Sequence, residues 1–312
     1  MARYIASRLI LAIPTVLAVL TLVFFVVRVI PGDPATAALG DYASQEAVEA
    51  LRERMGLNDP LYVQYFRFLA DLVRGDLGTS MITGKEISGL VRQVLPYTLE
   101  LTITAIFIGA ILGVPIGIYT ARHVNTSIDY AGRVGSLAGL SVPAFYLGIL
   151  IMLLFAYKFQ LFPAVGGGDL GDLKSNLSHL VLPALTLGLI MTASVTRLTR
   201  SAMLNVLKDD YVRTARAKGL SEQVVVFRHA LRAALVPIVS IIGIWAASLV
   251  ADSVLTETVF ARPGLGKMLV SAILQRDYTL LQSVMVIYAL FVVGINLITD
   301  IIYSFVDPRI TH

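Results

Sequence analysis

Six long apolar segments decide what this chain can fold into. Each holds about 20 or more predominantly apolar residues, the length that a helix needs to cross the roughly 30 Å hydrocarbon core of a bilayer. The chain of 312 residues is 56% hydrophobic and only 15% charged, far from the balance of an average globular domain. We therefore predict an all-α polytopic membrane protein with six transmembrane helices, at Leu9–Ile30, Leu99–Thr120, Val134–Tyr157, His179–Leu198, Ile238–Val259 and Thr279–Phe305.

The first segment has a second interpretation. Arg3 and Arg8 precede an apolar run, and the small residues Ala35–Ala37 follow it, as in a cleaved signal peptide. The run Leu9–Val27 is 19 residues long, which exceeds the roughly 7–15 residues of a signal-peptide core. A retained span is the preferred interpretation.

Lysine and arginine in the short loops predict the orientation, because cytoplasmic loops carry an excess of both. Two arginines precede the first span, Arg122 and Arg133 lie between spans two and three, and residues 197–237 hold eight bases against three acids. With these regions in the cytoplasm, both termini are cytoplasmic and residues 31–98 lie outside. The three bases of residues 260–278 then lie outside as well, and they mildly oppose the rule.

The outer segment, residues 31–98, is predicted to be helical and ordered. One helix begins at the N-cap Ser44 and ends at Gly56. A second, amphipathic helix carries its apolar residues on one side, at Leu61, Tyr65, Phe68, Leu69 and Leu72. The preferred interpretation is a small cap packed on the outer face of the bundle, and the alternative is a docking surface for an external partner.

Glycine and proline recur inside the spans. Gly109, Gly113 and Gly117 are spaced four apart, which allows close approach of a neighbouring helix. We expect this contact within one chain, although the spacing also suits subunit pairing. Three prolines interrupt spans two, three and four and are expected to kink them: Pro115, Pro143 and Pro183.

Acidic residues in the fifth span are candidates for the translocation path or a gate. Acids inside a membrane are costly and often line a pathway, which points to Asp252 and Glu257. Five residues apart on a helix, they diverge by about 140° and cannot both face one line of the pore. We expect the backbone amides of the turn "FARPGLG" to anchor Glu257, and Asp252 to border the path. Arg28 ends the first span, where snorkelling explains it.

Several kinds of chemistry are excluded. The chain has no cysteine and four scattered histidines without ligand spacing, so no metal site is predicted. The stretch "ARPGLGKM" resembles a phosphate-binding loop but has Ala261 and Met268 where that loop needs Gly and Ser or Thr. We therefore predict a protein that is not an enzyme, binds no cofactor itself and contacts membrane lipid rather than nucleic acid.

The basic segment is predicted to be a helix, a glycine turn and a second helix. "NVLKDDYVRTARAKG" ends at the C-cap Gly219, and Ser221 caps "EQVVVFRHALRAAL", which runs to Pro237. Along the second helix, an apolar stripe is formed by Val224, Phe227, Leu231 and Leu235, with Arg228 and Arg232 elsewhere on the surface. A solvated loop that serves only topology is the alternative, but forty residues with this turn chemistry favour an ordered lever.

This segment resembles the EAA loop of binding-protein-dependent ABC importer permeases. Ala215, Gly219 and Leu231 match its consensus, whereas Arg213, Thr214, His229 and Arg232 depart from it. Seven further stretches resemble the dipeptide, oligopeptide and nickel branch of this family, and within it the dipeptide-permease B type. They are "PGDPA" at 31–35, "GLNDPLYVQY" at 56–65, "GDLGTS" at 75–80, "SVPAFYLG" at 141–148, "TVFARPGLGKM" at 258–268, "AILQRDY" at 272–278 and "DPRI" at 307–310.

The resemblance implies a permease subunit of an ATP-driven importer in the inner membrane of a bacterium. It implies three domains: a first span at 1–30, an extracytoplasmic segment at 31–98 and a five-helix core at 99–312 with a coupling loop at about 199–236. The implied partners are a second homologous permease, two cytoplasmic ATPases that hold ATP and Mg, and an external binding protein. The residues expected to couple to the ATPases are Arg213, Ala215, Arg216, Lys218, Gly219, Leu220 and Leu231.

The expected solute is peptide-like, with nickel chelates, glutathione and oligosaccharides as alternatives within the same family. A secondary transporter is the rival class. It would need an intramembrane ion site or inverted repeats with broken helices, and neither is evident in the six spans.

Overall fold

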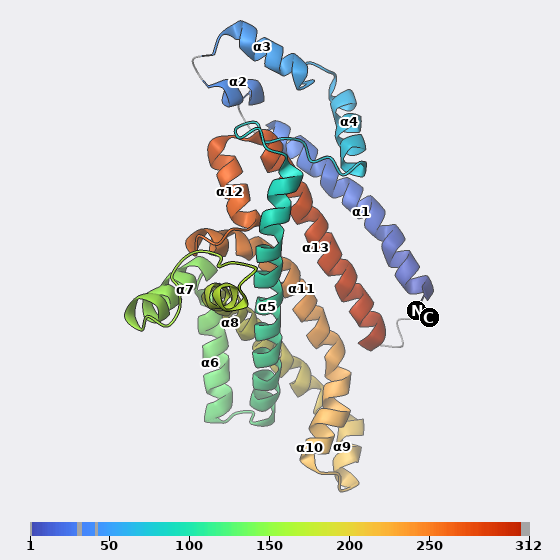
Figure 1. The fold of residues 1–312 in the computed structure, drawn as a ribbon. Coiled ribbons are helices and arrows are strands. Elements are labelled where there is room, and N and C mark those ends of the chain that lie inside the picture. The colour runs from blue at the N-terminus through green and yellow to red at the C-terminus, as the bar shows by residue number, and fades with distance from the viewer. Residues whose placement is uncertain (1, 30–32, 41–42, 307–312) are drawn as a thin grey trace.

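The computed structural model describes residues 2–29, 33–40 and 43–306, which form helices joined by short turns (Figure 1). Within these ranges the only bridge of β type is an isolated one between Thr79 and Glu86. The helices are α1 Ala2–Val29, α2 Pro34–Leu39, α3 Gln45–Arg54, α4 Leu61–Val73, α5 Ile87–Arg122, α6 Ser127–Ser141, α7 Ala144–Ile151, α8 Leu173–Val206, α9 Asp210–Ala217, α10 Glu222–Val224, α11 Leu231–Val259, α12 Leu265–Gln275 and α13 Tyr278–Val306, with π-helical segments η1 Met152–Lys158 and η2 Val225–Ala230.

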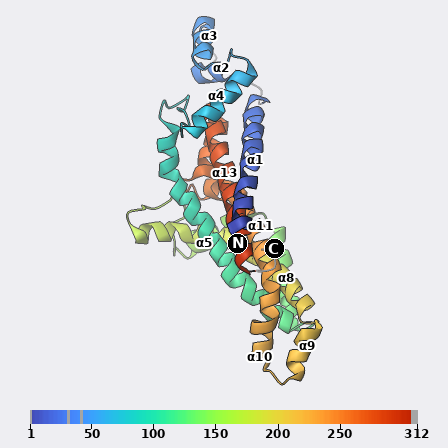
Figure 2. The ribbon, with the colours of Figure 1, turned by 90° about the vertical axis from the view of Figure 1, so that its right-hand side faces the viewer.

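The molecule has two distinct ends. Helices α2, α3 and α4 form an arch at one of them, and α9 and α10 project from the other (Figures 1 and 2). We refer to these as the α4 end and the α9 end. Away from the α4 end, α1 and α13 are joined by an ion pair between Arg8 and Asp300, with 3.3 Å between nitrogen and oxygen.

Five described helices are long and apolar enough to cross a membrane, and a sixth span is a bent pair. The predicted span Val134–Tyr157 is wrong as a single helix, because α6 and the α7–η1 segment meet at 103°. The break lies at Pro143, which has no amide hydrogen to continue the ladder of α6. Val142 before it is extended, at φ −94° and ψ 123°, as the ring of a following proline favours.

Helix α8 is the most deeply buried of the long helices, and α5 packs along it. The three predicted contact glycines of α5 face α8 side chains at Met191, Val195 and Thr199. A Cβ on Gly113 would lie 2.7 Å from the Cβ of Val195 and 3.1 Å from the Thr192 carbonyl oxygen. The close approach predicted within one chain is therefore confirmed. Pro115 and Pro183 lie inside continuous helices.

The arch contains the two helices predicted for residues 31–98. The Ser44 hydroxyl accepts a hydrogen bond of 3.2 Å from the Ala47 amide and caps α3. On α4, Phe68, Leu69 and Leu72 pack against Leu20 and Val23 of α1 and Val286 of α13. Leu61, predicted on the same face, is exposed instead, since it occupies the first turn of α4, at the end where the arch turns away from α1.

The helix that follows the basic turn does not stop at Pro237 as predicted. Residues Glu222–Val259 form one continuous helical stretch through η2 into α11, with Pro237 inside it. A proline removes one backbone hydrogen bond, which a helix in a membrane bundle tolerates when neighbours compensate. The segment near the turn and the fifth span are thus a single rod of 38 residues.

Candidate functional site

The turn at the α9 end is closed by its own backbone. Gly219 has φ +78° and a Cβ there would meet nothing within 4 Å, so the conformation rather than crowding favours glycine. The Leu220 amide donates to the Ala215 carbonyl at 3.4 Å, and the Gly219 amide donates to the Arg216 carbonyl at 2.9 Å. This pair of bonds is the Schellman arrangement. The predicted glycine C-cap is confirmed. The single helix predicted over residues 205–219 is wrong, because α8 ends at Val206 and α9 begins at Asp210.

An ion pair crosses the turn. Arg216 donates to both carboxylate oxygens of Glu222, from Nη2 at 2.9 Å and from Nε at 3.1 Å. The hydrogen bond to the Glu222 carboxylate raises the pKa of Arg216 against the opposing effect of burial. Ser221 occupies the N-cap position, but its hydroxyl makes no cap hydrogen bond, so the predicted side-chain cap is wrong. The ion pair across the turn holds the start of the second helix instead.

Packing also joins α9 to the rod. Val212 and Ala215 of α9 form a buried cluster with Val225 of η2. Farther along, Val226, Ala230 and Ala234 pack against Ile118 and other residues of the membrane core. The predicted stripe is seen only in part: Leu231 packs against this cluster, but Phe227 is 53% exposed, and Val225 and Val226 are buried in its place. The wider π-helical turn of η2 shifts the register that an α-helix would have.

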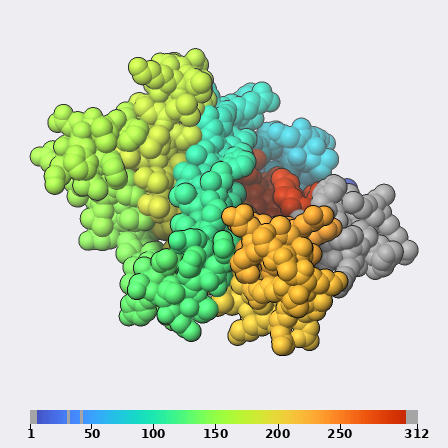
Figure 3. All heavy atoms as spheres, turned by 90° about the horizontal axis from the view of Figure 1, so that it is seen from below, coloured from blue at the N-terminus to red at the C-terminus, as the bar shows by residue number. Residues whose placement is uncertain are grey.

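The predicted coupling residues divide into two groups. Ala215 is buried and Leu231 is partly buried, so both serve packing of the segment itself. Five others are exposed around the turn: Arg213, Arg216, Lys218, Gly219 and Leu220. Figure 3, seen from the α9 end, shows this segment in orange as a projecting mass beside the green turn between α5 and α6.

A buried ion pair fixes the helix that leads into the segment. Asp129 of α6 is fully buried and binds Arg200 of α8 through both oxygens, with Nη2 to Oδ2 at 2.8 Å. The Asn125 amide also donates to this carboxylate at 3.0 Å. The sequence does not reveal the pair, because Arg200 is one of eight bases in residues 197–237. The available signal was Asp129, the single acid in the segment between Arg122 and Arg133.

Glu257 anchors the turn between α11 and α12. Its buried carboxylate accepts hydrogen bonds from the Thr98 hydroxyl at 2.7 Å, the Gly266 amide at 2.7 Å and the Lys267 amide at 3.2 Å. The two amides belong to the first turn of α12, where a helix has unpaired N–H groups and favours negative charge. A Cβ on Gly264 would overlap this carboxylate. The structure thus shows the amide anchoring expected for Glu257.

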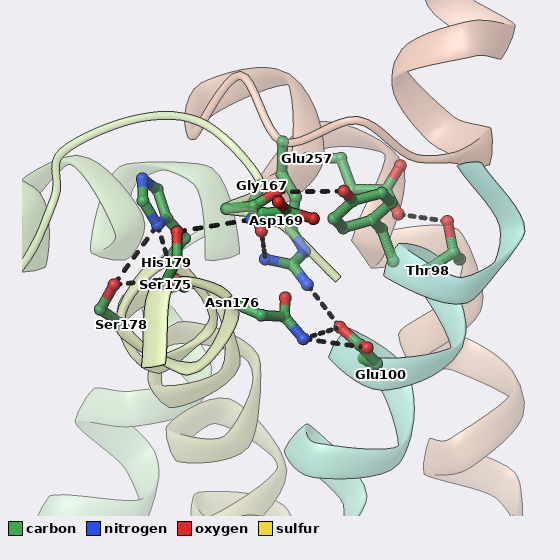
Figure 4. A network of polar contacts seen from close by, with 12 residues as sticks. Thr98, Glu100, Gly167, Asp169, Ser175, Asn176, Ser178, His179 and Glu257 are labelled. Atoms are coloured by element: carbon green, nitrogen blue, oxygen red, sulfur yellow. Dashed lines mark hydrogen bonds and ion pairs between the residues drawn. The ribbon is translucent and has the colours of Figure 1, made fainter. Parts of the chain in front are cut away.

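A second buried network lies beside it. The buried guanidinium of Arg262 binds Glu100 of α5 at 2.9 Å and the Gly167 carbonyl at 3.3 Å. Asn176 of α8 donates to both oxygens of Glu100, at 3.0 and 3.1 Å, and Figure 4 shows these two side chains facing each other. Burial lowers the pKa of Arg262, and the nearby Glu100 opposes this shift. The sequence identified neither Glu100 nor Asn176.

Asp252 has the opposite surroundings to Glu257. It is half-buried on α11, and no hydrogen bond or ion pair joins its carboxylate to another described residue. The divergence predicted from the spacing of five residues is seen, since one acid is enclosed by donors and the other is not. The role of Asp252 in a path stays a prediction. Among the described residues, no cluster of three or more His, Asp or Glu side chains is placed to hold a metal.

Comparison with known proteins identifies the family. The sequence profile described as "Binding-protein-dependent transport system inner membrane component" matches residues 113–312. The chain belongs to this family. The profile described as "Binding-prot-dependent transport system membrane comp, N-term" matches residues 1–102 of the permease. It is a multi-pass membrane protein and the permease subunit of an ABC importer, a system that also contains a partner permease, ATPases and a binding protein.

The permease is similar over its whole length to curated relatives. It is 38% identical to the dipeptide transport system permease protein DppB of Alkalihalophilus pseudofirmus, and 40% identical to the oligopeptide transport system permease protein AppB of Bacillus subtilis. It is 38% identical to the glutathione transport system permease protein GsiC of Salmonella typhimurium. Each alignment covers 100% of both chains.

The fold has a solved counterpart. A chain of the inward-facing MetNI methionine ABC transporter superposes with a TM-score of 0.58 at 21% identity, covering 70% of the permease and 96% of that chain. At this identity the similarity concerns the fold alone.

Proposed function

We propose that the permease forms half of a translocation path for a short peptide-like solute. The supporting observation is whole-length identity of 38–40% to permeases named for dipeptides, oligopeptides and glutathione, which all share a peptide backbone. A second, homologous permease supplies the other half of the path. A soluble binding protein delivers the solute to the α4 end.

In the proposed orientation, the α9 end and both termini lie in the cytoplasm of a bacterium and the arch lies outside the inner membrane. The supporting feature is the excess of Lys and Arg near the α9 end and in the turn between α5 and α6. Because the chain has no cysteine, a single Cys at Glu49 on α3 tests this by labelling. Reaction only from the cytoplasmic side would contradict the orientation.

Coupling to the ATPases occurs at the exposed α9 turn. The permease itself binds no cofactor and catalyses no reaction, and ATP with Mg is bound by two separate ATPase subunits. Arg213 and Lys218 are free of the turn's own ion pair and meet acidic groups of the ATPase. Gly219 and Leu220 supply the protruding backbone and apolar contact.

The permease is built to transmit motion from this turn. The Schellman hydrogen bonds, the pair of Arg216 with Glu222 and the cluster of Val212, Ala215 and Val225 join α9 rigidly to the rod. The rod of 38 residues spans about 55 Å at 1.5 Å per residue. It carries Asp252 and Glu257 near its other end, so displacement of the turn by an ATPase moves the residues that hold α12 and α5 together.

The test is uptake by the complete transporter in proteoliposomes. Labelled dipeptides, a free amino acid and a nickel chelate are offered in turn, each with the cognate binding protein and ATP inside. Peptide uptake that requires both ATP and the binding protein supports the proposal. Uptake of the nickel chelate alone, with no uptake of any peptide, would contradict it.

A further inference from the structure

A cavity of about 600 Å³ lies beneath the arch, between α1, α4, α13 and the turn after α4. Its wall contains one cation at the end of α1, Arg28, together with Gln64 of α4 and Gln282 of α13. This region plays no part in coupling or in the buried networks around Glu257. It is therefore a separate place where a ligand can be held.

Arg28 is a half-buried cation without an acid. Its guanidinium donates to Gln64 Oε1 at 3.1 and 3.3 Å, to Gln282 Oε1 at 3.4 Å and to the Phe24 carbonyl at 3.1 Å. Its carbon Cζ lies 3.4 Å from the centre of the Phe24 ring. All of these partners are neutral, and no described Asp or Glu forms an ion pair with Arg28.

The other charged groups in the wall of the cavity already have partners. Arg52 binds Asp33 at 3.1 Å and Arg67 binds Asp59 at 2.9 Å. Asp71 lies 3.8 Å from Arg74, and Asp76 accepts from the Gly78 amide at 2.8 Å. Arg28 is thus the cation that an incoming anion would neutralise, and a charge removed from water favours such a partner.

Helix α4 presents three different rows of residues. One row packs on α1 and α13, as described above. A second, polar row faces the cavity and includes Gln64, Arg67 and Asp71. A third row is apolar and exposed, at Tyr62, Phe66, Ala70 and Val73, with Phe66 65% and Val73 89% exposed. Large apolar side chains at helical spacing that no described residue covers are typical of a helix at a membrane surface.

The contacts of α4 with α1 place it beside the span rather than above it. The hydroxyl groups of Tyr65 and Thr21 are 2.6 Å apart, and the rings of Tyr65 and Phe24 are 5.2 Å apart. Thr21 lies about 12 Å along the helix axis from Val29, the last described residue of the span. The exposed row of α4 is therefore at the depth of the headgroups and upper acyl chains of that leaflet.

An apolar groove lies on a neighbouring face of α1 and shares no residue with the wall of the cavity. It is lined by Ala18, Thr21, Leu22, Phe25, Val26 and Val29, and Val29 is about 100° around the helix from Arg28. From Val29 to Ala18 the groove covers about 16 Å of helix, close to half of the roughly 30 Å hydrocarbon thickness. A cation at the surface with an apolar groove on the next face of the same helix matches a molecule that has an anionic head and an alkyl chain.

We propose that this place binds a phospholipid of the leaflet at the α4 end. The phosphodiester group lies against Arg28 between α1, α4 and α13, and one acyl chain follows the groove on α1. The lipid would join the peripheral span and the arch to the bundle, a role additional to the proposed transport function.

Lipid binding to the purified full-length permease tests the proposal. The chain is delipidated in detergent and titrated with dioleoylphosphatidylglycerol, and bound lipid is counted by native mass spectrometry. We expect Arg28→Gln to weaken binding of one lipid by about tenfold or more, because a charge-assisted contact is lost. Arg28→Lys should retain part of the affinity, and the control Arg54→Gln, an exposed cation of α3 that does not line the cavity, should match the wild type. Equal binding by Arg28→Gln would overturn the proposal.

The source of the phosphate is separated by competition. Glycerol 3-phosphate and inorganic phosphate carry the anion without an alkyl chain, so they should fail to displace the lipid at concentrations where a second phospholipid succeeds. Displacement by the soluble anions at equal concentration would show a site for small anions and overturn the lipid assignment.

A measurement of depth does not depend on a stable Arg28 variant. Spin labels on Phe66→Cys and Arg67→Cys, placed in nanodiscs of phosphatidylglycerol and phosphatidylcholine, report contact with oxygen in lipid or with a nickel chelate in water. We expect the label at Phe66 to be reached by oxygen and the label at Arg67 by the chelate. Equal exposure of both labels to the chelate would overturn the placement of α4 in the leaflet.

Discussion

The α9 turn and the Glu257 anchor are both held by hydrogen bonds and charge, but they are built over different distances in the chain. The turn is local: Arg216 binds Glu222 six residues later, and Leu220 binds Ala215 five residues earlier. The anchor joins Glu257 to Thr98, which is 159 residues away, and Arg262 to Glu100, which is 162 residues away. The first is exposed and ready to meet a partner, and the second is enclosed.

This difference suggests separate tasks for the two regions. A site that binds another subunit needs exposed groups on a rigid segment. The ion pairs within such a site are weak, because water screens them. A site that holds three helices in register has buried donors and acceptors, each of which is costly to leave unpaired. Changes in the anchor should therefore affect stability most, and changes in the turn should affect coupling most.

The largest expected effect follows from Glu257→Gln. The new amide group must point an N–H₂ at either the Thr98 hydroxyl or the amides of Gly266 and Lys267, where the carboxylate accepted from all three. We expect a loss of about 3 kcal/mol in stability, measured by thermal unfolding of the purified permease and by the yield of assembled transporter. Normal assembly combined with a pure transport defect would contradict the role as an anchor.

Gly219→Val comes next and tests the turn. A β-branched residue at φ +78° is strained by about 1–2 kcal/mol, and the strain distorts the Schellman turn. We expect the permease to insert and assemble, while ATP-driven uptake and solute-stimulated ATP hydrolysis fall together. Gly219→Asn tolerates the left-handed region and is the matched control. Normal uptake by the valine variant would show that the turn does not couple.

The two regions also differ in how much of their structure could be predicted from the sequence. Gly219 and the Ser44 cap were predictable, because a glycine after a helical run or a serine before one determines the local backbone. The contact of Gly113 with α8 was predictable in kind, since spacing by four indicates a close helix neighbour. The sequence did not reveal which helix that neighbour is.

Other features depended on three-dimensional arrangement. No local pattern links Glu100 to Arg262 or Asp129 to Arg200, because the partners come together only when the bundle forms. The break at Pro143 was predicted as a kink, but its angle of 103° depends on the packing of α7 against α8 and α11. The π-helical turn at η2 was also missed, and one widened turn was enough to exchange Phe227 for Val225 and Val226 in the core.

Arg216→Gln should have a smaller effect on stability. The pair with Glu222 is 40% and 47% exposed, so its loss should cost only about 0.5 kcal/mol. Its effect on coupling should be larger than this energy suggests, because the pair fixes the angle between α9 and the rod. We expect reduced stimulation of ATP hydrolysis at unchanged melting temperature. The comparison is Arg213→Gln, whose pair with Asp210 lies within α9 and does not cross the turn. As a proposed contact with the ATPase, Arg213 should affect coupling through its charge, and this effect should shrink at high salt.

If both arginine variants lower coupling equally and the effect shrinks at high salt, the loss is one of charge toward the ATPase. If the loss in Arg216→Gln persists at high salt while the loss in Arg213→Gln disappears, and Arg216→Lys restores coupling in part, the geometry of the turn is the cause. Equal losses in the two variants would show that the exposed charges alone account for coupling, and that the pair of Arg216 with Glu222 has no separate role as a stiff support.

Asp252→Asn should have the smallest effect on stability. It also tests most directly whether Asp252 and Glu257, both on α11, have different functions. The carboxylate has no described partner to lose, and the amide has nearly the same shape, so the melting temperature should stay within the error of the wild type. Asp252 also lies about 7.5 Å along the axis from Glu257 and on a different face of the helix. An acid in a span without a partner is costly unless water reaches it, so a water-filled path is the surrounding that fits it.

Removing the charge of Asp252 from such a path should change uptake by a few-fold and change it differently for peptides of different charge. Uptake of a cationic, a neutral and an anionic dipeptide by the Asn variant measures this, with Glu257→Gln at matched amounts of assembled transporter as the comparison. A cation is attracted by Asp252 and an anion repelled, so the ratio of cationic to anionic uptake should fall in the variant. An unchanged ratio would place Asp252 outside the path and leave α11 as a coupling rod that carries no group in contact with the solute.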